Sequence, residues 1–132
     1  MRQHGLSKKE RIKSKKSFNE LFTTGKVLIS KDQKIKAVYL AEKTTEEFGV
    51  KIAAAVSKKH GKAVWRNRVK RLIRTSYRLN KEKLAVFCKK KKILLRVVFS
   101  TFSMTEETTK KMSLKDIMPG VIELMQRIES RI

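Results

Sequence analysis

The chain has 132 residues, of which 34 are Lys or Arg and 12 are Asp or Glu, so its formal net charge is +22. That length suits one globular domain and excludes a core plus an independent second domain, while a single cysteine excludes an internal disulfide. Self-repulsion this strong indicates an anionic partner. Because the sequence contains neither the apolar run of a signal peptide nor the roughly 20 apolar residues that cross a bilayer, we expect a cytoplasmic protein with a polyanionic partner and no membrane contact.

The first part of the chain is basic and then helical. Residues 1–13 are polar and basic, and we expect a flexible arm there. The residues that follow supply an N-cap, apolar positions at helical spacing and a terminating glycine: Ser14, Phe18, Leu21, Phe22 and Gly25. They predict a short helix over residues 14–25, and a further strand is expected to begin at Ile29.

The next apolar segments predict β-strands. Residues 35–42 (IKAVYLAE) are rich in β-forming residues, and residues 49–57 (GVKIAAAVS) place alternate apolar side chains on one face. The polar turn between them, KTTEE, favours an antiparallel hairpin. Residues 93–99 (ILLRVVF) are apolar almost throughout, which predicts a central strand.

Two amphipathic helices complete the predicted elements. Around residues 65–77 one helical face gathers the side chains suited to a core: Trp65, Val69, Leu72, Ile73, Ser76 and Tyr77. Apolar residues at spacings of three and four predict a second helix over 114–128, with Pro119 breaking or restarting it and a possible start at Thr105. The predicted fold is α+β, with helices packed on a sheet, in one domain over residues 1–132 that ends in a helical extension over 113–132.

The opposite side of the 65–77 helix is basic. Lys70, Arg71, Arg74 and Arg78 cluster around Asn67, and Arg66 and Arg68 flank the apolar stripe. No Asp or Glu occurs between Val50 and Asn80, so the segment has no internal partner for these charges. A solvated face is the simplest alternative, and Asn67 could be a plain polar surface residue. The prevalence of Arg, whose planar fork engages phosphate oxygens, favours contact with nucleic acid.

These residues also carry a family resemblance. The segment AVWRNRVKRLIR, residues 63–74, resembles the signature of the protein subunit of bacterial ribonuclease P. RIKSKKSFNELFTTGK resembles that family's N-terminal helix, and AVSKK at residues 55–59 resembles the strand that leads into its basic loop. The resemblance covers about residues 11–111. Trp65 stands at a variable position of the motif, and the tail beyond Met112 departs from the family pattern.

The resemblance implies a fold and a set of contacts. The fold would be a mixed four-stranded sheet with three helices and a left-handed βαβ crossover, where general rules favour a right-handed one. Contacts with a catalytic RNA would be made by nine residues of the loop and helix: Lys58, Lys59, Lys62, Arg66, Asn67, Arg68, Lys70, Arg71 and Arg74. A cleft between the first helix and the sheet, lined by Phe18, Phe22 and Tyr39, would hold a single-stranded 5′ leader of precursor tRNA. For Phe18 and Phe22 the alternative is core packing, and Tyr39 could do either.

No set of residues suggests that the protein itself is the catalyst. His4 lies in the predicted arm and His60 in the basic loop, and no Cys/His spacing fits zinc. Cys88, beside four lysines, could have a lowered thiol pKa, but an ordinary unpaired cysteine is the simpler interpretation. The resemblance assigns magnesium-dependent hydrolysis to the RNA, with no cofactor bound by the protein alone and one protein per RNA. A ribosomal protein is the second interpretation, and a basic helix on a membrane surface the third.

Overall fold

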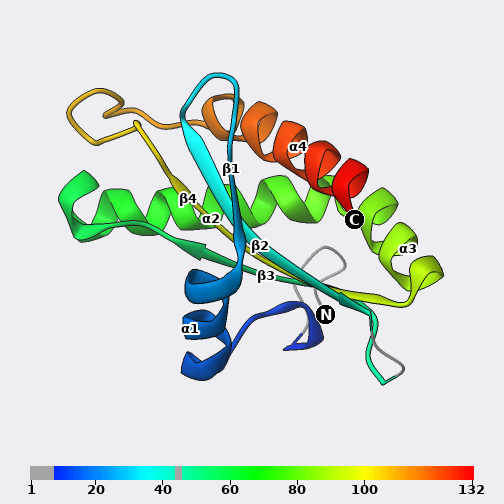
Figure 1. Cartoon of the computed structure of the whole chain (residues 1–132). Helices are drawn as coiled ribbons and strands as arrows, with labels where there is room; N and C mark the ends of the chain where they lie inside the picture. Colours follow the sequence, from blue (N-terminus) through cyan, green and yellow to red (C-terminus); the bar gives the residue numbers. More distant parts are fainter. Residues whose placement is uncertain (1–7, 44–45) are drawn as a thin grey trace.

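The computed structural model describes residues 8–43 and 46–132 (Figure 1). The described residues form a four-stranded mixed sheet and four α-helices, an α+β fold as predicted, with one helix more than the resemblance implies. The elements in chain order are η1 (Lys8–Glu10), α1 (Lys15–Thr24), β1 (Lys26–Ile29), β2 (Ile35–Lys43), β3 (Gly49–Ala55), η2 (Lys58–His60), α2 (Ala63–Asn80), α3 (Glu82–Lys91), β4 (Ile93–Thr101) and α4 (Leu114–Arg131).

The strand order in the sheet is β1-β2-β4-β3. The prediction that residues 35–42 and 49–57 pair as a hairpin is wrong, because β4 lies between them, antiparallel to β2 and parallel to β3. The apolar run of β4 is buried along most of its length and therefore takes the centre, as predicted. Within the turn that suggested the hairpin, Thr44 and Thr45 lie outside the described residues.

The sheet begins immediately after the first helix. Ser14 caps α1 by accepting a hydrogen bond from the backbone N–H of Ser17, and the helix ends at Gly25 as predicted. A Cβ at Gly25 would lie 2.4 Å from the carbonyl oxygen of Leu21 and 2.9 Å from Val38 Cγ1, so only glycine lets the chain turn directly into β1. Ile29 ends β1 rather than beginning a strand, which corrects the prediction.

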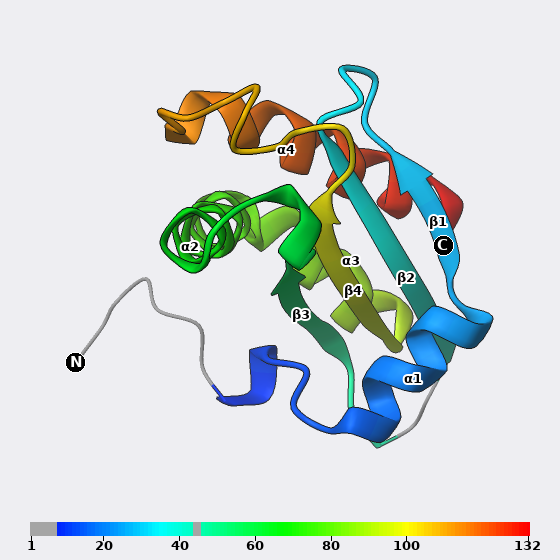
Figure 2. The ribbon, with the colours of Figure 1, turned by 90° about the vertical axis from the view of Figure 1, so that its left-hand side faces the viewer.

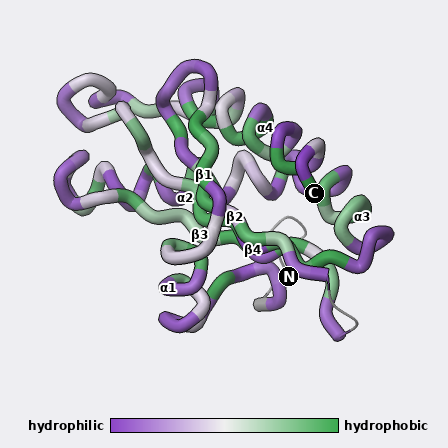
Figure 3. The backbone as a smooth tube through the Cα atoms, in the orientation of Figure 1, coloured by the Kyte–Doolittle hydropathy of each residue, from purple (hydrophilic) through white to green (hydrophobic). Residues whose placement is uncertain are grey.

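The two faces of the sheet are covered unequally (Figure 2). One face packs against α2, α3 and α4, and its alternate strand residues, such as Ile35, Leu95 and Phe99, have no exposed surface. The other face is crossed by α1, where Leu21 packs against Val98 in a much smaller cluster. Figure 3 shows the hydrophobic residues concentrated along the strands and the hydrophilic ones in the turns and at the helix ends. The main core therefore lies on the α2 side of the sheet.

The C-terminal segment belongs to that core. Residues 114–131 form one continuous helix in which Pro119 lies inside and causes no break, while residues 105–108 form a turn rather than a helix start. Ser113 and Asp116 form a capping box, and the hydrogen bond from the Ser113 backbone N–H lowers the pKa of Asp116. Four side chains of α4 have no exposed surface: Ile117, Val121, Leu124 and Ile128. The predicted extension is thus part of the main layer of helices.

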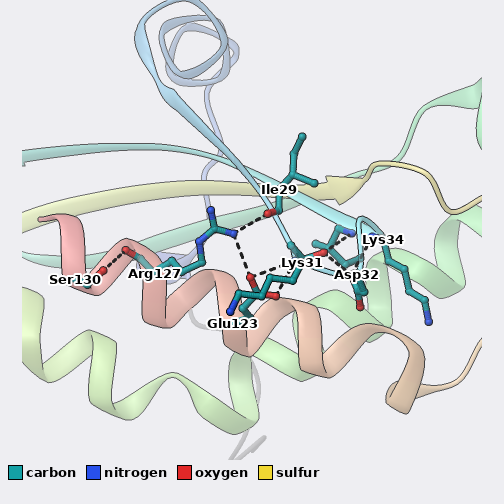
Figure 4. Close-up of polar contacts among 9 residues, drawn as sticks. Ile29, Lys31, Asp32, Lys34, Glu123, Arg127 and Ser130 are labelled. Carbon is teal, nitrogen blue, oxygen red and sulfur yellow. Dashed lines mark hydrogen bonds and ion pairs between the residues drawn. The ribbon is translucent and has the colours of Figure 1, made fainter.

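The same helix fastens the β1–β2 turn (Figure 4). Arg127 Nη1 donates to the carbonyl oxygen of Ile29 at 2.7 Å, and the Glu123 carboxylate accepts from the backbone N–H of Lys31 at 2.9 Å. Arg127 and Glu123 also form an ion pair at 3.1 Å. Because Ile29 ends an edge strand, these contacts satisfy backbone groups that would otherwise remain open at the edge of the sheet.

The predicted flexible arm covers residues 1–13, but residues 11–12 are held against the sheet. Arg11 forms a parallel bridge with Ile52, and the Ile12 backbone N–H donates to the Ile52 carbonyl oxygen at 3.1 Å. Ile12 is buried against Leu21 and Val98, because an apolar side chain beside an open strand edge gains both burial and a hydrogen bond. Residues 1–7 of that prediction lie outside the described residues. No helix that the structure describes is long and apolar enough to span a bilayer.

Candidate nucleic-acid interface

The basic helix α2 is fixed by its apolar face. Trp65, Val69, Ile73 and Tyr77 are buried in the main core, which confirms the face predicted from the sequence. The indole Nε1–H of Trp65 donates to the Thr109 carbonyl oxygen at 2.8 Å. The start of the helix is therefore anchored by the segment that follows β4, and the side of α2 that faces away from the core is set by this packing.

That outward side carries the predicted contact residues. Asn67, Arg68, Arg71 and Arg74 are exposed, whereas Arg66 and Lys70 are half-buried. Arg66 Nε donates to the Gly61 carbonyl oxygen at 3.0 Å, which keeps its guanidinium close to the helix start. We call these six residues the α2 basic face. Across residues 8–43 and 46–132, no ion pair includes a member of this face.

The loop before α2 extends this positive surface. Lys58, Lys59 and Lys62, the predicted contact residues of this loop, are all exposed. The hydroxyl of Ser57 accepts from the backbone N–H of Lys59 at 3.2 Å and shapes the η2 turn. The Glu106 carboxylate accepts from the backbone N–H of Lys62 at 2.9 Å, so this acid caps the helix start. The Lys62 side chain remains exposed to solvent.

A groove of about 770 Å³ joins this helix to α1. Its walls come from three parts of the chain that the fold brings together: Arg11, Ile12 and Phe18; Ile52, Ala53 and Ala54; Arg71, Arg74, Thr75 and Arg78. One wall is therefore cationic, one carries an aromatic ring, and β3 forms the floor. The two sites predicted separately, the basic helix and the aromatic cleft, meet in this groove.

The positive charges in the groove oppose one another. Partial burial lowers the pKa of the Arg74 guanidinium, and the nearby charge of Arg11 lowers it further. The Nε of Arg78 is buried and has no hydrogen-bond partner among the described residues. Such crowding of cations is unfavourable in the isolated chain, and an anion placed in the groove would relieve it.

The sheet floor beside α1 carries alanines and a serine toward β3 and larger side chains toward β1. In the paired register, Val27, Val38, Val98 and Ala53 form one row across the α1 side of the sheet. The next row contains Ile29, Lys36, Ser100 and Ala55. Phe22 is 57% exposed and so is not the core residue that the alternative interpretation allowed, whereas Phe18 is half-buried. The alanines of β3 lie at the end of each row that borders the groove, so the ring of Phe18 keeps an accessible side there.

The predicted place of Tyr39 in this cleft is wrong. Tyr39 is 3% exposed and packs in the main core, on the opposite face of the sheet from Phe18. Successive strand residues point to opposite faces, so Tyr39 faces α4, and its neighbours Val38 and Leu40 face α1. The sequence could not show which of the two faces would carry α1.

A buried arginine holds α1 on the sheet. Arg96 of β4 is 8% exposed; its Nη1 donates to the Ser17 hydroxyl at 2.9 Å, and its Nη2 forms ion pairs with Glu20 and Glu42. Ser17 and Glu20 belong to α1, and Glu42 to β2. This cluster fixes how α1 crosses the strands, and thus where Phe18 stands over the groove.

Sequence reasoning missed Arg11 and Arg96 as parts of the site. Arg11 lies in the segment predicted to be a flexible arm, and only its bridge to Ile52 brings it to the groove. The sequence did indicate a role for Arg96, because a single arginine inside a long apolar strand needs acidic or polar partners. Arg78 was placed in the basic cluster by the helical wheel, and the structure adds that it lines the groove.

The remaining candidates for chemistry do not approach the groove. Cys88 is buried in the main core, where desolvation raises the pKa of its thiol to about 11, so the four following lysines do not activate it. His60 Nδ1 lies 2.6 Å from the Thr101 hydroxyl. In the part of the chain that the structure describes, no three His, Cys, Asp or Glu side chains gather closely enough to hold a metal ion. The groove is thus built from cations, one aromatic ring and uncharged, mostly apolar side chains.

Comparisons of sequence agree with one another. The family model described as Ribonuclease P matches residues 6–127. A ribonuclease P protein component of Porphyromonas gingivalis is 33% identical over 100 residues, which cover 75% of this chain and 72% of that protein. A ribonuclease P protein component of Clostridium kluyveri is 41% identical over 76 residues, covering 58% of this chain and 63% of that protein. The match to the family model spans nearly all of the described residues.

Comparisons of structure show the same fold. The ribonuclease P protein of Thermotoga maritima superposes with a TM-score of 0.70 at 21% identity, covering 89% of this chain and 96% of that one. The ribonuclease P protein of Staphylococcus aureus gives a TM-score of 0.65 at 21% identity, covering 90% of this chain and 94% of that one. The strand arrangement and the helix layers are therefore shared despite low sequence identity.

Proposed function

This chain belongs to the ribonuclease P protein family, and on that premise we propose that it is the RNA-binding subunit of a ribonuclease P holoenzyme, which removes the 5′ leader from precursor tRNA. The α2 basic face binds the catalytic RNA, and the groove beside α1 holds the single-stranded leader. The observation that carries this proposal is a helix side rich in arginine whose members form no ion pair within the described residues.

The α2 basic face suits a folded RNA. Its arginines can engage phosphate oxygens with two parallel hydrogen bonds, and Asn67 can donate to a phosphate or a 2′-hydroxyl. Lys58, Lys59 and Lys62 add point charges in the preceding loop. Several phosphate contacts of this kind make the association fall steeply with salt, by about 0.7–0.9 log units per contact for each tenfold rise in salt.

The groove suits an extended single strand of variable sequence. Phe18 offers a ring on which a base can stack, and each such stack contributes about 1–3 kcal/mol with little preference among bases. Arg11 and Arg78, which are not part of the α2 basic face, line the same groove and can pair with the backbone phosphates of the strand. Phe22 extends the aromatic surface beyond the groove, while Tyr39 is left out because it lies in the core.

The chemistry of cleavage is assigned to the RNA subunit, with Mg²⁺ bound there. The protein contributes affinity: it holds the leader near the catalytic RNA and screens the repulsion between two polyanions with its own positive charge. In this proposal one protein binds one RNA, and the protein needs no cofactor of its own.

Reconstitution tests this function directly. The full chain is mixed with a bacterial ribonuclease P RNA, and cleavage of precursor tRNA is followed at low Mg²⁺ concentration, where repulsion between the RNAs limits the reaction. We expect the protein to stimulate cleavage well above the rate with RNA alone. A lack of stimulation together with co-sedimentation on ribosomes would instead support a ribosomal RNA-binding protein.

A double substitution tests the α2 basic face. Arg68→Ala with Arg71→Ala removes two exposed guanidinium groups and should weaken binding to the catalytic RNA about tenfold or more, without changing the circular dichroism spectrum. Lys31→Ala with Lys115→Ala removes the same charge from the region of the β1–β2 turn and the α4 start and serves as the control. If the arginine variant lost its folded spectrum, the two arginines would be structural instead.

A further inference from the structure

The end of α3 and the residue after it carry a second concentration of positive charge. Lys89, Lys90, Lys91 and Lys92 are consecutive and all exposed. Lys43, also exposed, is the cross-strand partner of Ile93 and so lies beside the end of this run. We call these five residues the lysine turn. Figure 3 shows a hydrophilic bend where α3 passes into β4.

The lysine turn forms no ion pairs within the part of the chain that the structure describes. Nearby acids already serve other lysines, since Glu47 pairs with Lys51 at 3.0 Å and Glu129 lies 3.9 Å from Lys83. Five exposed cations without an ion pair to any described residue therefore lie in adjoining segments, and one of them, Lys91, places its Nζ 5.9 Å from the centre of the Phe87 ring.

Local structure explains only some of these lysines. Lys89, Lys90 and Lys91 lie in the last turn of α3, where the helix dipole favours positive charge. Lys92 comes after that turn, with φ 57° and ψ 48°, the left-handed conformation in which glycine normally ends a helix. A lysine there costs stability that a glycine would not, so helix termination alone does not explain this lysine.

The lysine turn lies far from the α2 basic face. In Figure 1 the start of α2 and the end of α3 stand at opposite ends of the molecule. The 18 residues of α2 span about 27 Å at 1.5 Å per residue, and α3 follows that helix in the chain. The phosphates that pair with the α2 basic face near the start of the helix are therefore not those within reach of the lysine turn.

We infer that the lysine turn is a second RNA-backbone contact, which binds a phosphate segment distinct from the one held by α2. The inference rests on the proposed function. Lysine side chains are flexible point charges without the planar fork of arginine, so they suit phosphates irrespective of base sequence. The segment belongs either to the catalytic RNA or to the tRNA body of the substrate, and both present the same chemistry.

The first test removes three charges. The test variant combines three substitutions in the full chain: Lys89→Gln, Lys90→Gln and Lys91→Gln. The control variant has the same net charge and combines Lys31→Gln, Lys34→Gln and Lys115→Gln. Dissociation constants are measured against salt for the catalytic RNA alone and for precursor tRNA bound to the assembled holoenzyme. We expect the lysine-turn variant to reduce the salt slope by about 2 in one of the two titrations, and the control to leave both slopes at the wild-type value. The titration that changes identifies the RNA.

The second test exploits the backbone of Lys92. Lys92→Gly should raise the unfolding midpoint by about 3 °C, because glycine adopts the left-handed conformation without strain. The same variant should weaken RNA binding about two- to fivefold through the lost contact. If the lysine turn served only to keep the chain soluble, Lys92→Gly would raise the unfolding midpoint and leave RNA affinity unchanged.

The outcomes separate this inference from the proposed function. Unchanged slopes in the triple variant, with wild-type protein still stimulating cleavage, would overturn the inference and leave the function standing; the lysine turn would then be a solvated surface or a site for an acidic protein. Lys92→Gly with a raised midpoint and unchanged RNA affinity would overturn it equally. Failure of the wild-type protein to bind the catalytic RNA would instead defeat the proposed function.

Discussion

The two faces of the sheet are built for different purposes. On the face covered by α2, α3 and α4, large side chains such as Phe99 and Leu95 are fully buried. On the face crossed by α1, Ala53 and Ala55 lie in the same small cluster as the half-buried Phe18. The first face buries far more apolar surface and therefore dominates folding, while the second keeps apolar and aromatic surface available to a ligand.

Helix α2 contributes to both the main core and the groove. Its buried side packs in the main core, and its basic side forms one wall of the groove on the α1 side. In the proposed function, stability and RNA binding thus depend on opposite sides of one helix. The substitutions below test whether the two properties separate as this arrangement implies.

The largest expected effect is on the covered face. Phe99→Ala removes a ring with no exposed surface and should lower the free energy of unfolding by about 3–5 kcal/mol, through lost burial and the cavity left behind. Urea denaturation followed by circular dichroism measures the change. A loss below about 1 kcal/mol would contradict the assignment of the main core to this face.

An alanine enlarged on each face gives a matched comparison. Ala37 has no exposed surface on the covered face, so Ala37→Leu should destabilise the fold by about 1–3 kcal/mol through overpacking. Ala53 lines the groove, where the added atoms have space. Ala53→Leu should therefore change stability by less than about 1 kcal/mol while weakening the binding of leader-containing RNA. Equal destabilisation by both substitutions would remove the distinction between the faces.

The sequence was informative where one residue pattern determined one local outcome. Ser14 and Gly25 predicted both ends of α1, and the apolar stripe from Trp65 to Tyr77 predicted the buried side of α2. The long apolar run of β4 predicted a central strand. In each case the signal came from the segment itself, so it did not depend on how distant segments pair.

Predictions failed where the outcome depended on pairing between distant segments. The polar turn after β2 favoured a hairpin, but the parallel pairing of β3 with β4 arises only when α2 and α3 cross over the sheet. Tyr39 fell on the wrong face because a strand alternates sides with every residue and nothing local says which side α1 covers. Helix α3 was missed because its apolar stripe is short and ends in four lysines.

Substitution of Arg96, which holds α1 on the sheet, should affect both the stability of the fold and the binding of the leader. Arg96→Met removes the ion pairs to Glu20 and Glu42 and the hydrogen bond to Ser17, at a site that is 8% exposed. Because both carboxylates are half-exposed and can be hydrated, we expect a loss of about 1–2 kcal/mol in the free energy of unfolding. A freer α1 should also weaken leader binding, with affinity for the catalytic RNA unchanged. Arg96→Lys keeps the positive charge and should restore part of the leader affinity. If Arg96 stabilises the fold without positioning α1 for the leader, leader affinity should be unchanged in both variants.

The smallest expected effect on the fold comes from the open face itself. Phe18 is half-buried at the groove wall, so Phe18→Ala should cost little stability and should lower affinity for precursor tRNA about tenfold, the equivalent of one lost base stack. Mature tRNA lacks the leader and should bind both proteins equally. Phe22→Ala is the matched control for a ring outside the groove walls, and its effect should be smaller. Equal losses for precursor and mature tRNA would assign Phe18 to packing, and the open face would then need another ligand to explain its small side chains and crowded arginines.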